Sequence, residues 1–317
     1  MKRLLSILII VGLAAIPATA QTRPFNAAGV TAGHEHLAGT DAAAHNAFWT
    51  ALGAVPAQLG TGTQILKLPG IFIMFQNAGG RGGGGGRGAG APGAGGAPAG
   101  GAPATQPPAA AGGQAGAPRG GGGGGGAPAA APGPSEGSTV EHLAFKVKSL
   151  KDTLAKLDAA GTKTLAGATA TQAFVLAPNQ VKVQLVEDTT LATPIASSEM
   201  LMKVPNAAEA SAWYEKWFGA RVVKQGQSTV AEIPGMNIRF AETKDAVAGT
   251  QGRAINHIGL EVKNLEALMK KMTDAGVMVN RAYAAAPATI APLKSLGFIT
   301  DPWGTYIELN EGFSEIP

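Results

Sequence analysis

Short stretches in which apolar and polar residues alternate recur along the chain, and each precedes a helical pattern. In the clearest case, 257–262, every second residue is apolar, which predicts a strand that buries one of its faces. Asn264 then caps a predicted helix over 265–275, and Gly276 is the expected left-handed stop. This stretch is therefore a strand followed by a helix, and the strand begins at His257.

The same unit occurs four times. A capping residue, a short helix and a final glycine occupy 41–53, 149–161, 206–219 and 264–276. Seven residues before each cap stands a residue that can bind a metal: His34, His142, Glu199 and His257. Short apolar strands close the units, and their central residues are Met74, Gln184, Arg239 and Glu308. Such a repeat indicates one structural unit, or module, used four times.

The openings NHIGLEVKN and EHLAFKVKS and the closing segment DPWGTYIELNE resemble the vicinal oxygen chelate superfamily. That superfamily includes glyoxalase I, bleomycin-resistance proteins and extradiol dioxygenases. The resemblance implies an α+β fold of four βαβββ modules paired into two glyoxalase-like half-barrel domains. It also implies a divalent metal in the cavity, held by residues of the first and last strands.

The first twenty residues have the features of a secretory signal peptide. Lys2 and Arg3 precede an apolar run that is short for a membrane span, and 18–20 is a small-x-small cleavage site. The chain has no cysteine, which excludes disulfides, thiolate metal ligands and a lipoprotein anchor. We expect a periplasmic or secreted protein that starts near Gln21 and has no membrane association after cleavage.

Residues 79–137 are almost entirely Gly, Ala and Pro, and they predict a disordered linker because they cannot bury enough surface to offset ordering entropy. The linker separates a first module, 21–78, from a second, 138–188. These two are expected to pair, since the cost of loop closure grows only logarithmically with length. Modules three and four are expected to form the second domain, 199–313. So long a linker also permits exchange of modules between chains, which leaves a homodimer open.

The charge balance does not favour a nucleic-acid partner. The formal net charge of +4 falls to +2 when the two basic residues of the leader are removed. Three of the remaining arginines lie in the Gly/Ala/Pro tract, so the modules themselves are close to neutral. A small-molecule substrate or ligand is the better expectation.

The principal metal site is expected in the second domain. Through the resemblance, Glu199, His257 and Glu308 take the positions at which extradiol dioxygenases carry a triad of two histidines and one carboxylate. Such a set suits divalent Fe, Mn, Zn or Ni. Glu308 and Tyr306 are the expected catalytic residues, because a carboxylate free of the metal or a phenol can move a proton.

Arg239 departs from the pattern of the superfamily. Its guanidinium could pair with Glu199 and abolish the metal site, or it could bind an anionic substrate. In the second case Asn237 and Lys203, which are expected to face the same cavity, would be substrate-binding residues. Both interpretations stay open at the level of sequence.

The first domain is expected to hold a secondary, weaker site of His34, His142 and Gln184, because a neutral amide replaces a carboxylate there. His36 and His45 are expected to be ordinary, partly exposed, hydrogen-bonded side chains. The paired aromatics of the helices, 48–49 and 213–214, are expected to belong to the core rather than to a substrate site.

Two classes of function are consistent with these residues. As a lyase, isomerase or dioxygenase, the protein would use a metal to chelate adjacent substrate oxygens and stabilise an enolate or alkoxide. As a binding protein of the bleomycin-resistance type, it would sequester an amphipathic small molecule without metal or turnover. The superfamily is chemically diverse, so the fold alone does not choose between them.

Overall fold

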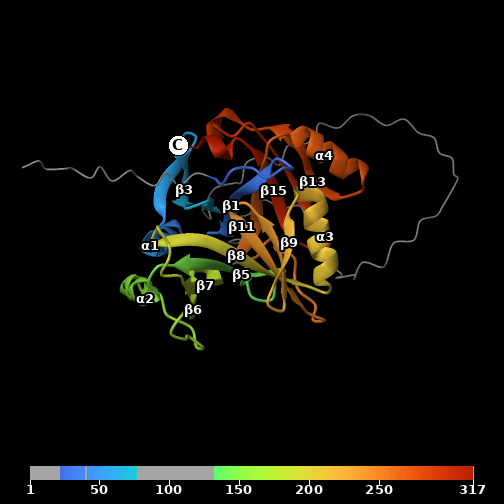
Figure 1. Cartoon of the computed structure of the whole chain (residues 1–317). Helices are drawn as coiled ribbons and strands as arrows, with labels where there is room; N and C mark the ends of the chain where they lie inside the picture. The colour runs from blue at the N-terminus through green and yellow to red at the C-terminus, as the bar shows by residue number, and fades with distance from the viewer. Residues whose placement is uncertain (1–21, 40, 77–131, 317) are drawn as a thin grey trace, which may run out of the picture. The chain divides into compact units, whose positions relative to one another are not determined.

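The computed structural model describes residues 22–39, 41–76 and 132–316 (Figure 1). The predicted leader, 1–20, and most of the predicted linker lie outside this range. The described residues form four α-helices and two mixed β-sheets, one of eight strands and one of seven. This α+β architecture with two large sheets confirms the predicted fold class.

The four helices begin and end close to where the capping pattern predicts. They are α1 (Ala42–Leu52), α2 (Leu150–Ala159), α3 (Ala207–Phe218) and α4 (Leu265–Asp274). Before each helix the side chain of a capping residue accepts a hydrogen bond from a first-turn amide; these residues are Asp41, Ser149, Asn206 and Asn264. Gly53 and Gly219 follow α1 and α3 with φ of 113° and 62°, a conformation that glycine adopts without a steric penalty.

The eight-stranded sheet has the order β13-β14-β15-β12-β1-β4-β3-β2. Its strands are β1 (Val30–Ala38), β2 (Val55–Leu59), β3 (Thr63–Leu68), β4 (Ile71–Gln76), β12 (Ile255–Val262), β13 (Met278–Ala285), β14 (Ser295–Thr300) and β15 (Tyr306–Glu311). Strands β1 and β12 are antiparallel and join the first module to the fourth. This sheet therefore combines the two ends of the chain.

The seven-stranded sheet has the order β6-β7-β5-β8-β11-β10-β9. Its strands are β5 (Val140–Val147), β6 (Gln172–Ala177), β7 (Val181–Glu187), β8 (Ile195–Val204), β9 (Arg221–Gln225), β10 (Ser228–Ile233) and β11 (Met236–Glu242). The antiparallel pair β5–β8 joins the second module to the third. Short 3-10 helices complete the fold: η1 (Pro178–Gln180), η2 (Ala288–Ile290) and η3 (Phe313–Glu315).

The predicted pairing of consecutive modules is wrong. Module one lies beside module four, and module two lies beside module three. The short connection 188–194 takes the chain from β7 to β8 on the other side of β5, so these two modules share a sheet. Loop closure could not decide between the two pairings, because its cost changes little with the length of a connection.

Two further details differ from the prediction: the number of strands in the second module and the end of the linker. Only β6 and β7 follow α2, so the second module has one strand fewer than predicted, and Thr164 contributes an isolated bridge to Val175. The last residues of the predicted linker belong to the fold, because Ser135 is buried and its hydroxyl accepts a hydrogen bond from the Lys182 amide at 2.9 Å. The ordered second module therefore begins before residue 138.

The main hydrophobic core joins both sheets and all four helices. Helix α1 packs beside α2 (Figure 1), and the rings of Trp49 on α1 and Phe145 on β5 lie 5.7 Å apart. Trp49 and Tyr214 are fully buried, which confirms the prediction that these helix aromatics are core. A second, smaller core lies on the eight-stranded sheet and includes Phe313 from the C-terminal segment.

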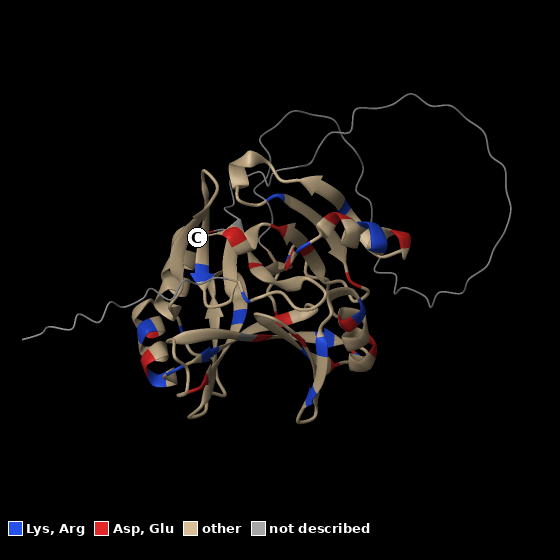
Figure 2. Ribbon diagram, turned by 45° about the horizontal axis from the view of Figure 1, so that its top comes forward, with Lys and Arg blue, Asp and Glu red and all other residues tan. Residues whose placement is uncertain are grey.

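Acidic and basic residues are interspersed over the helices and strands of the described chain (Figure 2). This distribution agrees with the near-neutral balance of the modules. Within the described ranges, none of the helices has the length and apolar composition needed to cross a membrane.

A buried hydrogen bond connects α3 to the turn before β15. The Tyr214 hydroxyl donates to Asp301 Oδ2 at 2.8 Å, and the amide of Thr305 donates to Asp301 Oδ1 at 2.7 Å. The Gly304 amide donates to the Asp301 carbonyl at 3.1 Å, which closes the predicted turn. Burial raises the pKa of Asp301 to about 6, because these hydrogen bonds offset only part of the lost hydration.

We expect Asp301 to make stability depend on pH. Its pKa in the folded state lies above the ordinary value of 3.8, so its contribution is present at lower pH and is lost as pH rises through about 6. Relative to Asp301→Asn, the wild-type free energy of unfolding should fall by ~2 kcal/mol between about pH 4 and about pH 7. Urea unfolding at a series of pH values measures this difference, and a difference that does not change with pH would contradict the assignment.

Candidate metal centre

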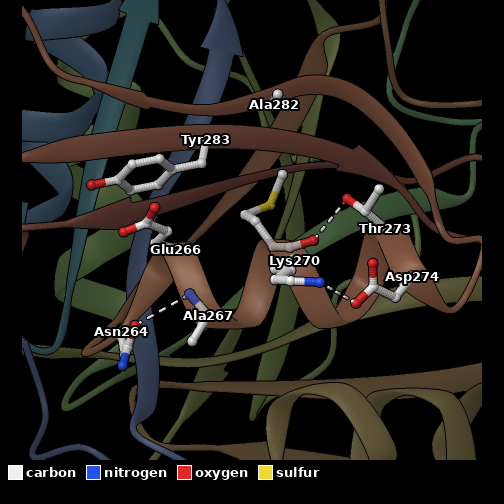
Figure 3. A pocket seen from close by; sticks show the side chains of 9 residues that line it. Asn264, Glu266, Ala267, Lys270, Thr273, Asp274, Ala282 and Tyr283 are labelled. Atoms are coloured by element: carbon white, nitrogen blue, oxygen red, sulfur yellow. Dashed lines mark hydrogen bonds and ion pairs between the residues drawn. The ribbon is translucent and has the colours of Figure 1, made fainter.

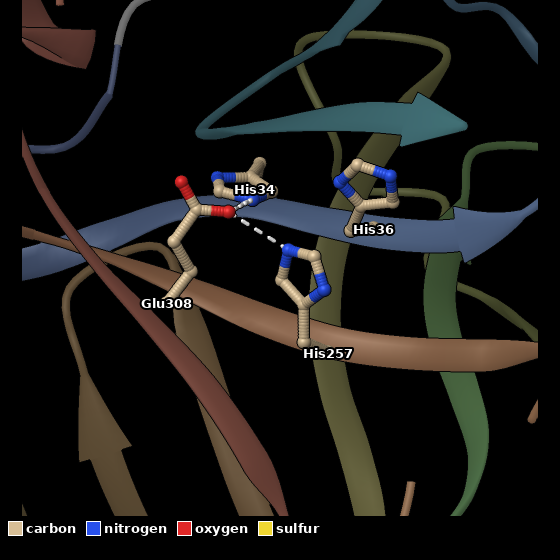
Figure 4. A group of neighbouring side chains, drawn as sticks. All are labelled: His34, His36, His257 and Glu308. Atoms are coloured by element: carbon tan, nitrogen blue, oxygen red, sulfur yellow. Dashed lines mark hydrogen bonds and ion pairs between the residues drawn. The ribbon is translucent and has the colours of Figure 1, made fainter. Parts of the chain in front are cut away.

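Three histidines and one glutamate converge on the eight-stranded sheet. His34 and His36 come from β1, His257 from β12 and Glu308 from β15 (Figure 4). One ligand atom from each residue can be chosen so that all four lie within 4.8 Å of one another. Because two modules supply these side chains, the cluster exists only when the first and fourth modules share a sheet.

Strand register brings the four residues together. In the antiparallel pair β1–β12, His36 lies opposite His257 and His34 lies opposite Gly259. In the parallel pair β12–β15, Gly259 lies opposite Glu308. An irregularity between Ala32 and His34 shifts the register there, and such a bulge re-aims the side chains that follow it.

Gly259 makes room for the imidazole of His34. A Cβ atom at position 259 would lie 2.1 Å from His34 Nδ1 and 2.2 Å from its Cε1. These distances are far inside van der Waals contact, so any larger residue would displace the ring. The absence of a side chain at Gly259 is therefore part of the construction of the site.

Glu308 is the electrostatic centre of the cluster. Its Oε2 lies 2.8 Å from His257 Nε2 and 3.4 Å from His34 Nε2, and its Oε1 accepts from Asn310 Nδ2 at 2.6 Å. Burial alone would raise its pKa, but the hydrogen bond with His257 and the nearness of His34 outweigh burial and hold the pKa well below its usual range. Glu308 therefore presents a carboxylate at neutral pH.

Two imidazoles of the cluster, those of His257 and His36, favour their neutral forms. Burial lowers the pKa of His257, with Glu308 acting in the opposite direction. Burial, followed by repulsion from His257 and His34, holds the pKa of His36 well below its usual range. Neutral imidazole is the form that binds metals.

Asn256 orients His257 from outside the cluster. His257 Nδ1 lies 2.9 Å from Asn256 Oδ1, and this contact fixes the orientation of the imidazole ring. His257 Nε2 and Glu308 Oε2 share a proton across 2.8 Å. A metal ion bound to both atoms would take the place of that proton.

The donor set fits a divalent metal. His34 is buried and His36 is half-buried, and none of their ring nitrogens, all of them inaccessible to solvent, makes a hydrogen bond. Buried polar atoms without partners are costly unless something binds them. Two imidazole nitrogens and one carboxylate, here His34, His257 and Glu308, form the triad found at non-haem Fe(II) sites, with His36 as an additional nitrogen beside it.

Aromatic rings surround the cluster. The rings of Phe298 and Tyr306 are stacked 5.0 Å apart, and both lie within 6 Å of the His257 ring, at 5.5 and 5.7 Å. Burial, followed by the charge of Glu308, raises the pKa of Tyr306. Its phenol is therefore protonated at neutral pH and can donate a hydrogen bond.

Glu199 does not lie beside His257 and Glu308. The predicted set of metal ligands is therefore wrong in including Glu199. Glu199 lies on the seven-stranded sheet, where Arg239 Nε and Nη2 donate to its two oxygens at 2.6 and 2.9 Å. This bidentate ion pair is the first of the two alternatives raised by Arg239. The pair occupies the carboxylate that a metal would need.

The seven-stranded sheet nonetheless carries a cavity of about 510 Å³. Its lining includes five residues singled out from the sequence: His142, Gln184, Glu199, Asn237 and Arg239. Lys203 is not among the lining residues, and its ammonium group pairs with Glu141. The predicted secondary site is thus divided: His142 and Gln184 line this cavity, and His34 belongs to the metal cluster.

His34 and His36 belong to one site, which the sequence-based expectation did not join. Residues two apart on a strand point to the same face, so the segment His34-Glu35-His36 carried a usable signal of a shared site. The expectation that His36 is an ordinary hydrogen-bonded side chain is wrong. The expectation for His45 is confirmed for its hydrogen bond, because its Nε2 lies 2.9 Å from Asn179 Oδ1, and wrong for its exposure, because the side chain is buried.

A separate hollow of about 590 Å³ lies between α4 and β13 (Figure 3). Its lining includes Asn264, Lys270, Asp274 and Tyr283, and Lys270 Nζ donates to Asp274 at 2.7 Å. It shares no residue with the metal cluster. Two of its charged groups, Lys270 and Asp274, pair with each other, and we assign the hollow no role in the chemistry.

Comparison with known proteins agrees with this geometry. Residues 198–309 match the sequence profile of the Glyoxalase/Bleomycin resistance protein/Dioxygenase superfamily. No protein of curated function has a sequence that matches the chain.

Solved structures share the fold at low sequence identity. Glyoxalase I from Zea mays is similar with a TM-score of 0.59 and 10% identity, over 90% of this chain and 94% of that one. A dioxygenase-like protein from Bacillus subtilis subsp. subtilis str. 168 is similar with a TM-score of 0.52 and 11% identity, over 93% of this chain and 88% of that one. The expected resemblance is thereby confirmed: the chain has the glyoxalase-like fold, and its residues 198–309 match the model of the Glyoxalase/Bleomycin resistance protein/Dioxygenase superfamily.

Proposed function

We propose that the protein is a metal-dependent enzyme of dioxygenase, lyase or isomerase type that acts on a small oxygenated molecule. The observation that carries the proposal is the buried cluster of His34, His257 and Glu308, which offers two imidazole nitrogens and one carboxylate. Divalent Fe, Mn, Zn or Ni suits these donors. A metal held there would polarise substrate oxygens and stabilise negative charge that develops on them.

The remaining residues have roles that follow from their positions. Asn256 and Asn310 hold His257 and Glu308 in fixed orientations through hydrogen bonds of 2.9 and 2.6 Å. The phenol of Tyr306, on the same strand as Glu308, would donate a hydrogen bond or a proton to a bound substrate. Phe298 would present an apolar wall that excludes water from one side of the site.

Export is a further part of the proposal. It depends on the basic start, the apolar run and the cleavage site within residues 1–20. A periplasmic or secreted enzyme would meet small molecules from outside the cell. The absence of cysteine agrees with a site that uses only nitrogen and oxygen donors.

Sequestration of a small molecule is a second candidate function. The observation that favours it is the cavity of about 510 Å³ on the seven-stranded sheet, where the ion pair of Glu199 and Arg239 replaces a metal set. Asn237 and Gln184 add amide groups to the lining. Such a cavity would bind a polar ligand without metal or turnover.

The first test is metal content. Wild-type protein purified without a histidine tag should bind one divalent metal per chain, and Glu308→Gln should lower both metal content and activity by at least about tenfold. Glu199→Gln is the matched control, because it changes a carboxylate on the other sheet and should leave metal content unchanged. Elemental analysis after dialysis measures the metal content of the wild type and of both variants. A wild-type chain that binds none of the four metals at micromolar concentration would leave sequestration as the function.

The second test uses Gly259. We expect Gly259→Ala to displace the imidazole of His34 and to weaken metal binding roughly tenfold to a hundredfold, with little change in overall secondary structure. Gly62→Ala is the control, since a Cβ at position 62 meets nothing within 4 Å. Competition with a chelator measures the affinity. Equal affinities for the two variants would show that His34 is not a ligand.

A further inference from the structure

A buried carboxylate fastens the C-terminal segment to the strand that carries His257. Glu261 lies on β12 and is 1% exposed. Its oxygens accept hydrogen bonds from the amides of Gly312, Phe313 and Ser314 at 2.7, 3.0 and 3.4 Å, and from the Ser314 hydroxyl at 3.2 Å. Four donors on one carboxylate fix both the position and the direction of the turn that contains η3.

The turn places Phe313 against the metal cluster. The ring of Phe313 is stacked on the imidazole of His34, with centroids 4.8 Å apart and planes inclined by 23°. Phe313 is itself buried, and its other neighbours in the small core include Phe72 and Leu296. His34 thus has Gly259 close to its ring and Phe313 stacked on its face.

His34 needs such support because no hydrogen bond orients it. Neither of its ring nitrogens has a hydrogen-bond partner, whereas His257 is oriented by Asn256. Histidines that bind metals are normally held by a hydrogen bond from the second ring nitrogen. At His34 the packed ring of Phe313 orients the imidazole instead of a hydrogen bond.

We propose that Glu261 and Phe313 are positioning residues of the metal centre. Glu261 fixes the C-terminal turn, the turn places Phe313, and Phe313 holds the imidazole of His34 in the orientation that the cluster requires. This inference rests on the proposed function, since it concerns the affinity of the same site. It assigns the C-terminal segment a part in the site, although no residue of that segment is a ligand.

The test measures Zn²⁺ affinity by chelator competition in the full chain. Glu261→Gln and Phe313→Leu should each weaken binding roughly tenfold to a hundredfold, as the loss of second-sphere support does elsewhere. The two changes combined should weaken binding no more than the stronger one alone, because both act through His34. Phe313→Leu keeps an apolar side chain in the core. This variant therefore still tests the proposal if Glu261→Gln does not fold.

Glu242→Gln is the matched control. Glu242 also receives a backbone amide, that of Ala207 at 3.1 Å, but it lies on the seven-stranded sheet and should not affect Zn²⁺ binding. Wild-type affinity in both Glu261→Gln and Phe313→Leu would overturn the inference. An equal loss in Glu242→Gln would also overturn it, because the effect would then be general.

A second measurement separates this inference from the proposed function. In metal-free protein, the imidazole resonances of His34, identified by their loss in His34→Ala, should shift in Glu261→Gln and in Phe313→Leu but not in Glu242→Gln. If the wild type binds no metal, the proposed function fails and these resonances still decide the positioning role. Unchanged resonances in both variants would refute that role.

Discussion

The antiparallel contact between β1 and β12 is the constraint on which the candidate site depends. It sets His36 opposite His257 and His34 opposite Gly259, and β15 then adds Glu308 from the other side of β12. Strand pairing fixes these distances because a shift of one residue would turn each side chain to the opposite face. A cluster built from the two ends of the chain thus depends on backbone hydrogen bonds for its geometry.

The two sheets use the same frame for different chemistry. In the eight-stranded sheet the equivalent positions carry His34, His257 and Glu308, which can share a cation. In the seven-stranded sheet Glu199 is neutralised by Arg239, whose guanidinium donates to both of its oxygens. The positive charge of Arg239 thus balances the carboxylate of Glu199, as a bound metal ion would. The protein therefore has one candidate metal centre within the described residues and a separate polar cavity.

The surroundings of the cluster explain how buried polar groups are tolerated there. Glu308 is stabilised as a carboxylate by His257 and by Asn310, and His257 is oriented by Asn256. His34 is held by packing, between a position that must lack a side chain and the ring of Phe313. Such a site is preorganised by residues that are not ligands, so its affinity depends on a shell wider than the cluster itself.

The sequence by itself determined the four modules, their helices and caps, and the core role of the helix aromatics, because capping and apolar periodicity are local properties. It also singled out His257 and Glu308, which lie in one module. Which modules pair was decided only by the tertiary structure, since loop closure scarcely distinguishes near from distant partners. That choice separated Glu199 from the cluster and brought His34 and His36 into it. A ligand set that spans two modules follows from sheet pairing, which strand periodicity does not encode.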